Sequence, residues 1–163
     1  MGKARTDQPE TCFRAVWEER NLLNTPGPFY GAETDTCLDG PEYAPESLLC
    51  DAKGHGFVWR QPRTDLETLA LMTGASSDPF TGFGWDGEEH WTPSMVRKWW
   101  ARREERASAV GVLLATWTEP GLSIAAAAYA DYIAGELPVY LRRYLRFLDS
   151  GRYPLGSDAL PRL

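Results

Sequence analysis

LSIAAAAYADYIAGELPVYLRRYLRFLDSG, residues 122–151, carries the helical pattern on which the fold depends. Its apolar side chains recur at the spacing of one face of an α-helix. Pro138 lacks a backbone N–H and clashes with the carbonyl four residues back, so we expect the helix to break there. A further helix is predicted over 137–149, and Gly151 is expected to end it. The predicted inward side chains are Ala126, Tyr129, Ile133, Leu137, Tyr140, Leu141, Tyr144, Leu145 and Leu148.

Three upstream segments also predict helices. Residues 13–23 carry apolar side chains at roughly helical spacing and predict a short helix. Thr64 and Glu67 form a capping box that opens a helix ending near Ala75. Its predicted inward side chains are Leu66, Leu69, Ala70 and Met72. Thr92, followed by a proline, is predicted to be the N-cap of a long helix that runs to Trp117.

Two short segments, 47–51 and 56–61, have the composition and the intervening turn of an antiparallel β-hairpin. A two-stranded ribbon is marginally stable alone, so we expect it to lie on the helices. The predicted fold class is mainly α, with four to five helices, a small antiparallel β-hairpin and long ordered loops. The length favours a single domain over 1–163, in which residues 1–10 are expected to be flexible.

The charge balance argues against nucleic acid as a partner. The 163 residues carry a formal net charge of −6, with a pI of about 5.0, and such a chain repels phosphates. No apolar run is long enough to span a bilayer, so we expect no membrane association. The start of the chain, MGKARTDQPE, lacks an apolar leader segment and the chain has only three cysteines, which favours a cytoplasmic location. The oligomeric state is left open.

The motifs that could carry chemistry are weak. Residues 82–87 fit the pattern G-x-G-x-x-G, but no strand is predicted before them and acids surround them. The possible metal ligands lack the close pairing of zinc and iron–sulfur sites: Cys37, Cys50, His55 and His90. A hairpin could bring Cys50 near His55, yet nothing in the sequence orients that base. We therefore expect no catalytic residues, no cofactor and no metal.

The predicted helix over 92–117 carries a basic patch, formed by Arg97, Lys98, Arg102, Arg103 and Arg106. Trp99 and Trp100 lie beside the patch, which is a combination found in nucleic-acid binding. The interleaved Glu104 and Glu105 favour a solvated helix face with ion pairs between successive turns. A further interpretation is that the patch pairs with acidic loops of the same chain.

Two predicted loops, 29–46 and 78–91, combine aromatic rings with carboxylates and contain no Lys or Arg. Long ordered loops often carry function, aromatic rings anchor interfaces, and acids attract a basic partner. The other interpretation is that the rings pack inward while the acids solvate the loop tips. The candidate partner-binding residues are Tyr30, Glu33, Asp35, Asp39, Glu42, Trp85, Asp86, Glu88, Glu89 and His90.

Three stretches resemble parts of a family of small uncharacterised actinobacterial proteins, some of which are labelled ferredoxins. These stretches are NLLNTPGPFYGAETDTCLDGPEYAPE (21–46), FVWRQP (57–62) and DPFTGFGWDGEEHWTP (78–93). The resemblance extends over about residues 14–106, and we expect it to include the C-terminal helices. A ferredoxin cluster needs four cysteine ligands, and this chain has three cysteines. The resemblance therefore implies no cluster ligands here, and it supplies no catalytic residues.

These observations favour a non-enzymatic cytoplasmic binding protein of the immunity or antitoxin type. Its acidic aromatic loops would occlude a protein partner, such as a basic toxin or enzyme. The alternative is a small-molecule or cofactor-binding enzyme with a pocket between the loops 29–46 and 78–91. An enzyme predicts a desolvated cavity with converging polar groups, whereas a binder predicts a broad exposed surface.

Overall fold

The computed structural model describes residues 12–35 and 39–163, so the predicted flexibility of residues 1–10 and any role of Cys37 lie outside the described residues. The fold is mainly α, as predicted. The helices are α1 (Asp39–Tyr43), α2 (Asp65–Ser76), α3 (Pro93–Ala101), α4 (Arg103–Thr116), α5 (Pro120–Ala134) and α6 (Leu137–Ser150). The strands are β1 (Tyr30–Gly31), β2 (Leu48–Cys50), β3 (Gly56–Val58) and β4 (Phe83–Gly84). In the described ranges, no helix has the length and apolar character that crossing a membrane requires.

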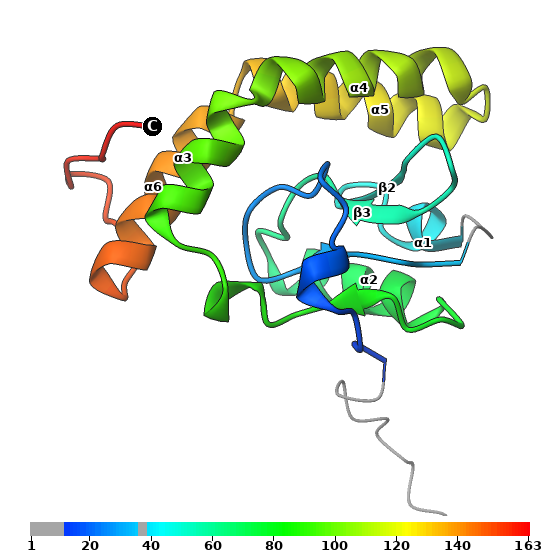
Figure 1. The fold of residues 1–163 in the computed structure, drawn as a ribbon, viewed down its shortest axis with the longest axis horizontal. Coiled ribbons are helices and arrows are strands. Elements are labelled where there is room, and N and C mark those ends of the chain that lie inside the picture. Colours follow the sequence, from blue (N-terminus) through cyan, green and yellow to red (C-terminus); the bar gives the residue numbers. More distant parts are fainter. Residues whose placement is uncertain (1–11, 36–38) are drawn as a thin grey trace, which may run out of the picture.

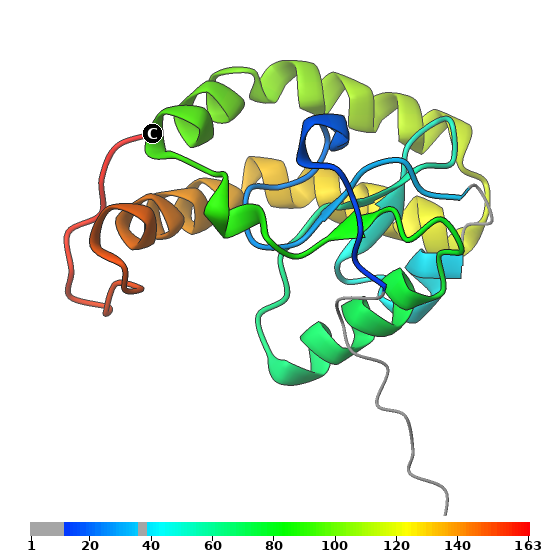
Figure 2. The ribbon, with the colours of Figure 1, turned by 60° about the horizontal axis from the view of Figure 1, so that its bottom comes forward.

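Helices α3 to α6 form one layer of the molecule. Figure 1 shows α4 beside α5 and α3 beside α6. Figure 2 shows the strands between α2 on one side and α3 and α4 on the other. The predicted single helix over 92–117 is wrong in one respect, because it breaks at Arg102 (φ −98°, ψ 21°). The break lets α3 pack on α6 while α4 packs on α5. A straight helix would lose one of these contacts.

The pattern of residues 122–151 is confirmed. Helix α5 ends at Ala134, and Pro138 lies in the first turn of α6, where its missing N–H costs no helical hydrogen bond. Gly151 ends α6 in the left-handed conformation (φ 73°) and donates its N–H to the Phe147 carbonyl. Of the predicted inward side chains, Tyr140 and Leu148 are half-buried, and the other seven are buried.

The predicted hairpin is confirmed as β2 paired antiparallel with β3. As expected, it lies against the helices (Figure 1). Phe57 and Trp59 both contact the ring of Tyr129 on α5, each with a centroid separation of 5.9 Å. The main core therefore sits between the hairpin and the helical layer.

Helix α2 begins as predicted, because the Thr64 side chain accepts the N–H of Glu67 at 3.1 Å. Its predicted inward face is wrong for Leu66 and Leu69, which are exposed, whereas Leu71 and Ala75 are buried. The other two residues predicted to face inward, Ala70 and Met72, are half-buried and pack against the smaller core cluster. A close approach between α2 and α1 sets this rotation. A side chain at Gly74 would place its Cβ only 2.8 Å from the Gly40 carbonyl oxygen.

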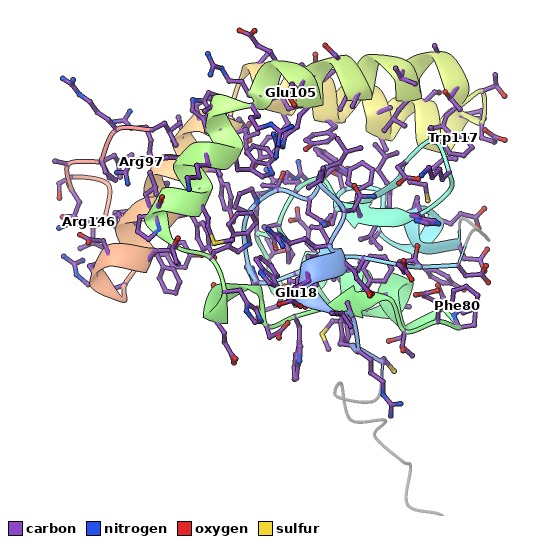
Figure 3. All side chains as sticks on the ribbon, viewed as in Figure 1. Glu18, Phe80, Arg97, Glu105, Trp117 and Arg146 are labelled. Carbon is purple, nitrogen blue, oxygen red and sulfur yellow. The ribbon has the colours of Figure 1, made fainter. Side chains whose placement is uncertain are left out.

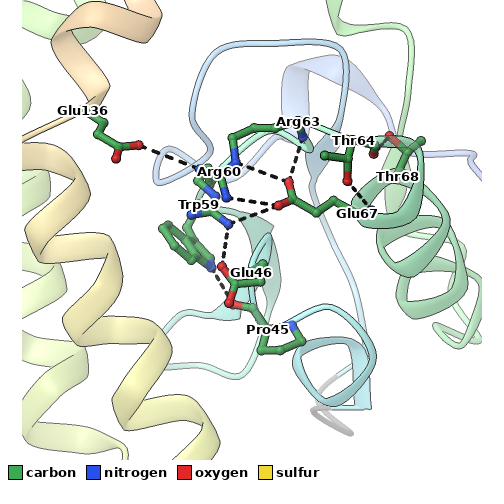
Figure 4. Close-up of polar contacts among 9 residues, drawn as sticks. All are labelled: Pro45, Glu46, Trp59, Arg60, Arg63, Thr64, Glu67, Thr68 and Glu136. Atoms are coloured by element: carbon green, nitrogen blue, oxygen red, sulfur yellow. Dashed lines mark hydrogen bonds and ion pairs between the residues drawn. The ribbon is translucent and has the colours of Figure 1, made fainter.

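An ion-pair network joins the end of the hairpin to α2 and to the turn between α5 and α6 (Figure 4). The Arg60 guanidinium lies between the carboxylates of Glu46 and Glu67. Arg63 contacts Glu67 at 3.1 Å and Glu136 at 3.9 Å. The Arg60 side chain is largely buried, so its two carboxylate neighbours offset the desolvation of its charge.

The predicted helix over 13–23 is wrong. Only Trp17–Glu19 is helical, as one 3-10 turn, and Phe13 instead forms a β-bridge with Gly82. The N–H groups of Arg14 and Ala15 donate at 3.1 Å to carbonyls of the chain around β4. Backbone pairing with a distant segment has therefore replaced the local helical hydrogen bonds that the spacing predicted.

The segment that follows, residues 24–32, is not a surface loop. Asn24 is buried, and its amide makes bonds to both β1 and β3. Its Nδ2 donates to the Gly31 carbonyl at 2.7 Å, while its Oδ1 accepts the N–H groups of Gly31 and Val58 at 2.9 and 2.8 Å. One buried side chain thus satisfies the polar groups of an irregular segment, as burial requires.

Candidate binding surface

The two candidate loops meet where β1 pairs antiparallel with β4. Beyond one end of this pair, the Ala32 N–H donates to the Gly82 carbonyl at 2.8 Å. Beyond the other end, the Gly87 N–H donates to the Pro28 carbonyl at 2.9 Å. The acids of the first loop therefore lie beyond one end of the strand pair, and those that follow Trp85 lie beyond the other end. The predicted partner-binding residues thus divide into two groups.

Asp78 joins the loops at the first of these ends. Its buried carboxylate accepts the N–H groups of Asp35 at 2.8 Å and of Gly82 at 2.6 Å. A buried carboxylate that accepts backbone N–H bonds from both segments fixes their relative position. Asp78 is therefore part of the loop framework rather than part of the surface.

Asp86 is held from two sides at the other end of the strand pair. The Tyr30 hydroxyl donates to one carboxylate oxygen at 2.8 Å, and Nε2 of His90 lies 3.1 Å from the other. The His90 ring stacks on Trp17, with 4.8 Å between centroids. The segment that carries Asp86 is therefore braced by hydrogen bonds and by ring packing.

The hydrogen bond between Tyr30 and Asp86 affects the protonation state of both residues. Burial, and then the hydrogen bond to Asp86, raises the pKa of the Tyr30 hydroxyl well above its ordinary value, so Tyr30 stays a neutral donor. Burial disfavours the charge on Asp86, but the hydrogen bonds from Tyr30 and His90 outweigh it and lower the pKa of that carboxyl. Asp86 is thus a carboxylate at neutral pH.

Tyr30 itself is only 1% exposed. The sequence predicts that this ring contacts a partner. In the structure, Tyr30 lies in β1, which pairs with β4 and has both of its residues buried, so the ring is not at the surface. Its place in the site is to position Asp86, and it offers no surface to a partner.

Trp85 is the exposed ring of this group, with 41% of its surface accessible. It stacks on Phe13 with 6.0 Å between centroids, which limits its rotation. Glu88 and Glu89 are exposed in the 3-10 turn Gly87–Glu89. Burial of part of its side chain raises the pKa of Glu88. We define the acidic surface as Trp85, Asp86, Glu88, Glu89 and His90.

The first loop contributes a separate group. Glu33, Asp39 and Glu42 are exposed, and Asp35 is half-buried. Asp39 and Glu42 lie on α1, which packs against α2 rather than against the acidic surface. These four predicted residues do not join Trp85 and Asp86 in one site.

The sequence reasoning missed two residues near these groups. Phe80 is 66% exposed and lines a shallow depression with Glu33, and Glu18 is exposed on the 3-10 turn that carries Trp17. Figure 3 labels both, with Glu18 on that turn and Phe80 on the second loop. Glu18 was missed because the sequence predicted a helix over 13–23 and not a turn next to the loops. An exposed phenylalanine has no sequence signal of its own.

One cavity that both loops line, beside Asp78, is small. It is lined by residues that include Thr34, Asp78 and Phe83, and its volume is about 20 Å³. Such a space holds about one water molecule, whereas pockets for organic ligands are much larger. The cavity beside Asp78 is therefore too small for an organic ligand, whereas the open depression at Glu33 and Phe80, which residues of both loops also line, has a volume of about 350 Å³.

The glycine motif has a structural explanation. The N–H of Gly82 donates to Asp78, and that of Gly87 donates to Pro28. Gly84 lies beneath the Tyr30 ring, where a Cβ would overlap the ring. Donors that are already used in the loop cannot bind a pyrophosphate.

The possible metal ligands do not converge among the residues that the structure describes, where no group of three His, Cys, Asp or Glu could hold an ion. Cys50 is buried in β2, and the N–H of His55 donates to the Asp51 carboxylate at 3.0 Å in the hairpin turn.

The basic patch on α3 and α4 is only partly the solvated face that the sequence predicted. Arg102 forms an ion pair with Glu105 at 2.7 Å on the surface, and Glu105 is labelled in Figure 3. Arg106, however, is buried, with 7% of its surface exposed. Over the described ranges, no ion pair joins the patch to either acidic loop.

No protein-family model, curated protein or solved structure matches this chain. The resemblance to the small actinobacterial proteins stays a prediction.

Proposed function

We propose that this chain is a non-enzymatic cytoplasmic binding protein of the immunity or antitoxin type. In this proposal, the acidic surface occludes a basic partner, such as a toxin or an enzyme. The observation that carries it is the exposed Trp85 ring beside Asp86, which Tyr30 and His90 hold in a fixed position. A ring that needs little ordering on association keeps more of its binding energy.

The charges of this surface support a cationic partner. Glu88 and Glu89 are exposed, and the ion pairs among the described residues include neither of them. Their two charges are part of the net charge of −6. Complementary charge steers encounter and raises the association rate more than it raises affinity. The acidic surface is therefore suited to rapid capture of a basic protein.

The proposal is tested by affinity capture from the source organism with two matched variants. The first is Glu88→Lys/Glu89→Lys, and the second is Glu104→Lys/Asp131→Lys, which makes the same charge change at exposed acids of α4 and α5. We expect a basic protein to be retained by the wild type and by the second variant, and to be lost from the first. Retention by both variants, or capture of acidic proteins alone, would contradict the proposal.

A further inference from the structure

A groove of about 210 Å³ lies between the residues after the first 3-10 turn and helices α3 and α4. Among the described residues that line it, four are cationic and none is acidic: Arg20, Lys98, Arg102 and Arg106. Trp91 and Trp99 provide apolar walls. The groove uses no residue of the acidic surface, and its concentration of positive charge is unexpected in a chain of net charge −6.

The Arg106 guanidinium is fixed in this groove. Its Nε donates to the Leu22 carbonyl at 3.2 Å, and its Nη1 donates to the Arg102 carbonyl at 3.1 Å. Its central carbon lies 4.4 Å from the centroid of the Trp99 ring. An arginine held by carbonyl groups and stacked on a ring presents its remaining N–H groups with little loss of entropy.

Arg20, on another segment that lines the groove, is held by one carbonyl and two rings. Its Nη1 donates to the Trp17 carbonyl at 3.0 Å. The guanidinium carbon lies 4.1 Å from the centroid of the Trp17 ring and 5.7 Å from that of Trp91. Two guanidinium groups from different segments are therefore preorganised around one space.

Carboxylates balance the positive charge of the groove only in part: Glu105 pairs with Arg102, and Glu18 and Glu105 also favour the charges on Arg20 and Arg106. In the described part of the chain, no ion pair includes Arg20, Lys98 or Arg106, and Arg102 pairs only with the exposed Glu105. Burial lowers the pKa of both Arg20 and Arg106, which is the sign of charges that have lost hydration. Charges that lose hydration are normally paired with an opposite charge, so a bound anion would give Arg20 and Arg106 the ionic partner that the described residues do not supply.

We propose that this groove binds the phosphoryl group of a small organic phosphate. The planar guanidinium fork matches the oxygens of a phosphoryl group in a bidentate manner, and several converging cations favour a ligand with more than one negative charge. The volume is below that of pockets for drug-sized ligands, which limits the organic part to a few atoms. This inference goes beyond the proposed capture of a basic protein.

The test is isothermal titration calorimetry of the full chain with four probes. Glycerol 3-phosphate carries the proposed chemistry, inorganic phosphate lacks the organic part, succinate replaces the phosphoryl group by carboxylates, and glycerol lacks charge. We expect glycerol 3-phosphate to bind, inorganic phosphate to compete with it, and glycerol to give no heat. Tighter binding of succinate than of either phosphate would overturn the assignment, as would no binding of glycerol 3-phosphate at millimolar concentration.

Two variants locate the binding in the groove. Arg106→Lys keeps the charge but removes the bidentate fork, and we expect it to weaken the binding of glycerol 3-phosphate about tenfold. Lys98→Ala changes an exposed side chain that makes no internal hydrogen bond among those of the described residues, so it should fold normally and weaken binding about threefold. The matched control is Lys53→Ala, in the hairpin turn, which should leave binding unchanged. Equal affinity of Lys98→Ala and the control would overturn the proposal even if Arg106→Lys failed to fold.

Discussion

Asp86 differs from the other acids of the acidic surface because two side chains determine its position and its charge. The Tyr30 hydroxyl and the His90 ring each contact one of its carboxylate oxygens. Glu88 and Glu89 have no comparable bonds and face solvent. A partner would therefore meet one carboxylate that side-chain hydrogen bonds hold in place and two exposed glutamates, with Trp85 beside them. The fixed position of Asp86 and the electrostatic attraction of a partner by Glu88 and Glu89 can therefore be tested separately.

Replacing Tyr30 by Phe tests the fixed carboxylate. The variant keeps the buried ring but removes the hydroxyl donor, so we expect a loss of about 1 kcal/mol in the free energy of unfolding. The pKa of Asp86 should move up towards its ordinary value, because one hydrogen bond that favours the charged form is gone. Urea unfolding and a carboxyl titration by NMR measure these effects. Tyr43→Phe, at an exposed ring, is the control and should change neither.

The lowered pKa of Asp86 also predicts a pH dependence. A carboxyl with a depressed folded-state pKa contributes stability above its unfolded pKa, near the ordinary value of 3.8, and this contribution is lost as the pH falls through the folded pKa. Asp86→Asn cannot titrate, so its free energy of unfolding should fall less than that of the wild type between about pH 6 and about pH 3. Parallel curves for the two proteins would show that Asp86 has no such linkage.

The sequence was sufficient to predict that the second loop contributes to the surface, but it was not sufficient to predict which single side chains are buried. Trp85, Glu88 and Glu89 are exposed, as their place in a Gly-rich turn predicts. Tyr30 is buried because β1 pairs with a strand more than fifty residues away, and no local pattern carries that information. Arg106 was assigned to a solvated face for the same reason, since Leu22 and Trp99 cover it from outside its own helix.

Among the secondary-structure elements, those with local signals were predictable. Thr64 and Thr92 cap their helices, Pro138 lies in a first turn, and Gly151 ends α6. The segment 13–34 was not predictable, because its hydrogen bonds go to β3, β4 and the helical layer instead of to its neighbours in the chain. Helical spacing in such a segment reflects the tertiary contacts of its apolar residues and does not produce a helix.

Gly151→Ala tests the end of α6. The left-handed conformation at this position (φ 73°) costs an alanine about 1 kcal/mol, because its Cβ crowds the backbone. Gly156→Ala is the matched control, since a Cβ there meets open space and the backbone lies outside the left-handed region. Thermal unfolding should separate the two variants, with only Gly151→Ala less stable than the wild type. Equal melting temperatures would contradict this account of the helix end.

At the scale of the whole molecule, two tyrosines join the helical layer to the irregular segment beneath it. The Tyr129 hydroxyl on α5 donates to the Leu23 carbonyl at 2.7 Å, and the Tyr140 hydroxyl on α6 donates to the Pro26 carbonyl at 2.8 Å. Tyr129 is buried and Tyr140 is half-buried. The helices thus satisfy the backbone carbonyls that enter the core, and this allows an irregular segment to support β1 and the acidic surface.

We expect Tyr129→Phe and Tyr140→Phe each to cost about 1 kcal/mol of unfolding free energy, because each leaves a carbonyl without its donor. The two hydroxyls bond different carbonyls, so the double variant should lose nearly the sum of the single losses. Urea unfolding measures all three. A double variant that is no less stable than either single variant would show that the two hydroxyls do not join the layers independently.

The most direct test of the account is the association rate constant of the chain with the basic partner that it captures, measured by surface plasmon resonance at several salt concentrations. If the acidic surface steers a cationic protein, Glu88→Lys/Glu89→Lys should lower this rate constant about tenfold at low salt, and the difference should shrink as salt screens the charges. Glu104→Lys/Asp131→Lys should change it far less. An association rate constant that falls equally in both variants, or that does not depend on salt, would contradict the proposed role of the acidic surface.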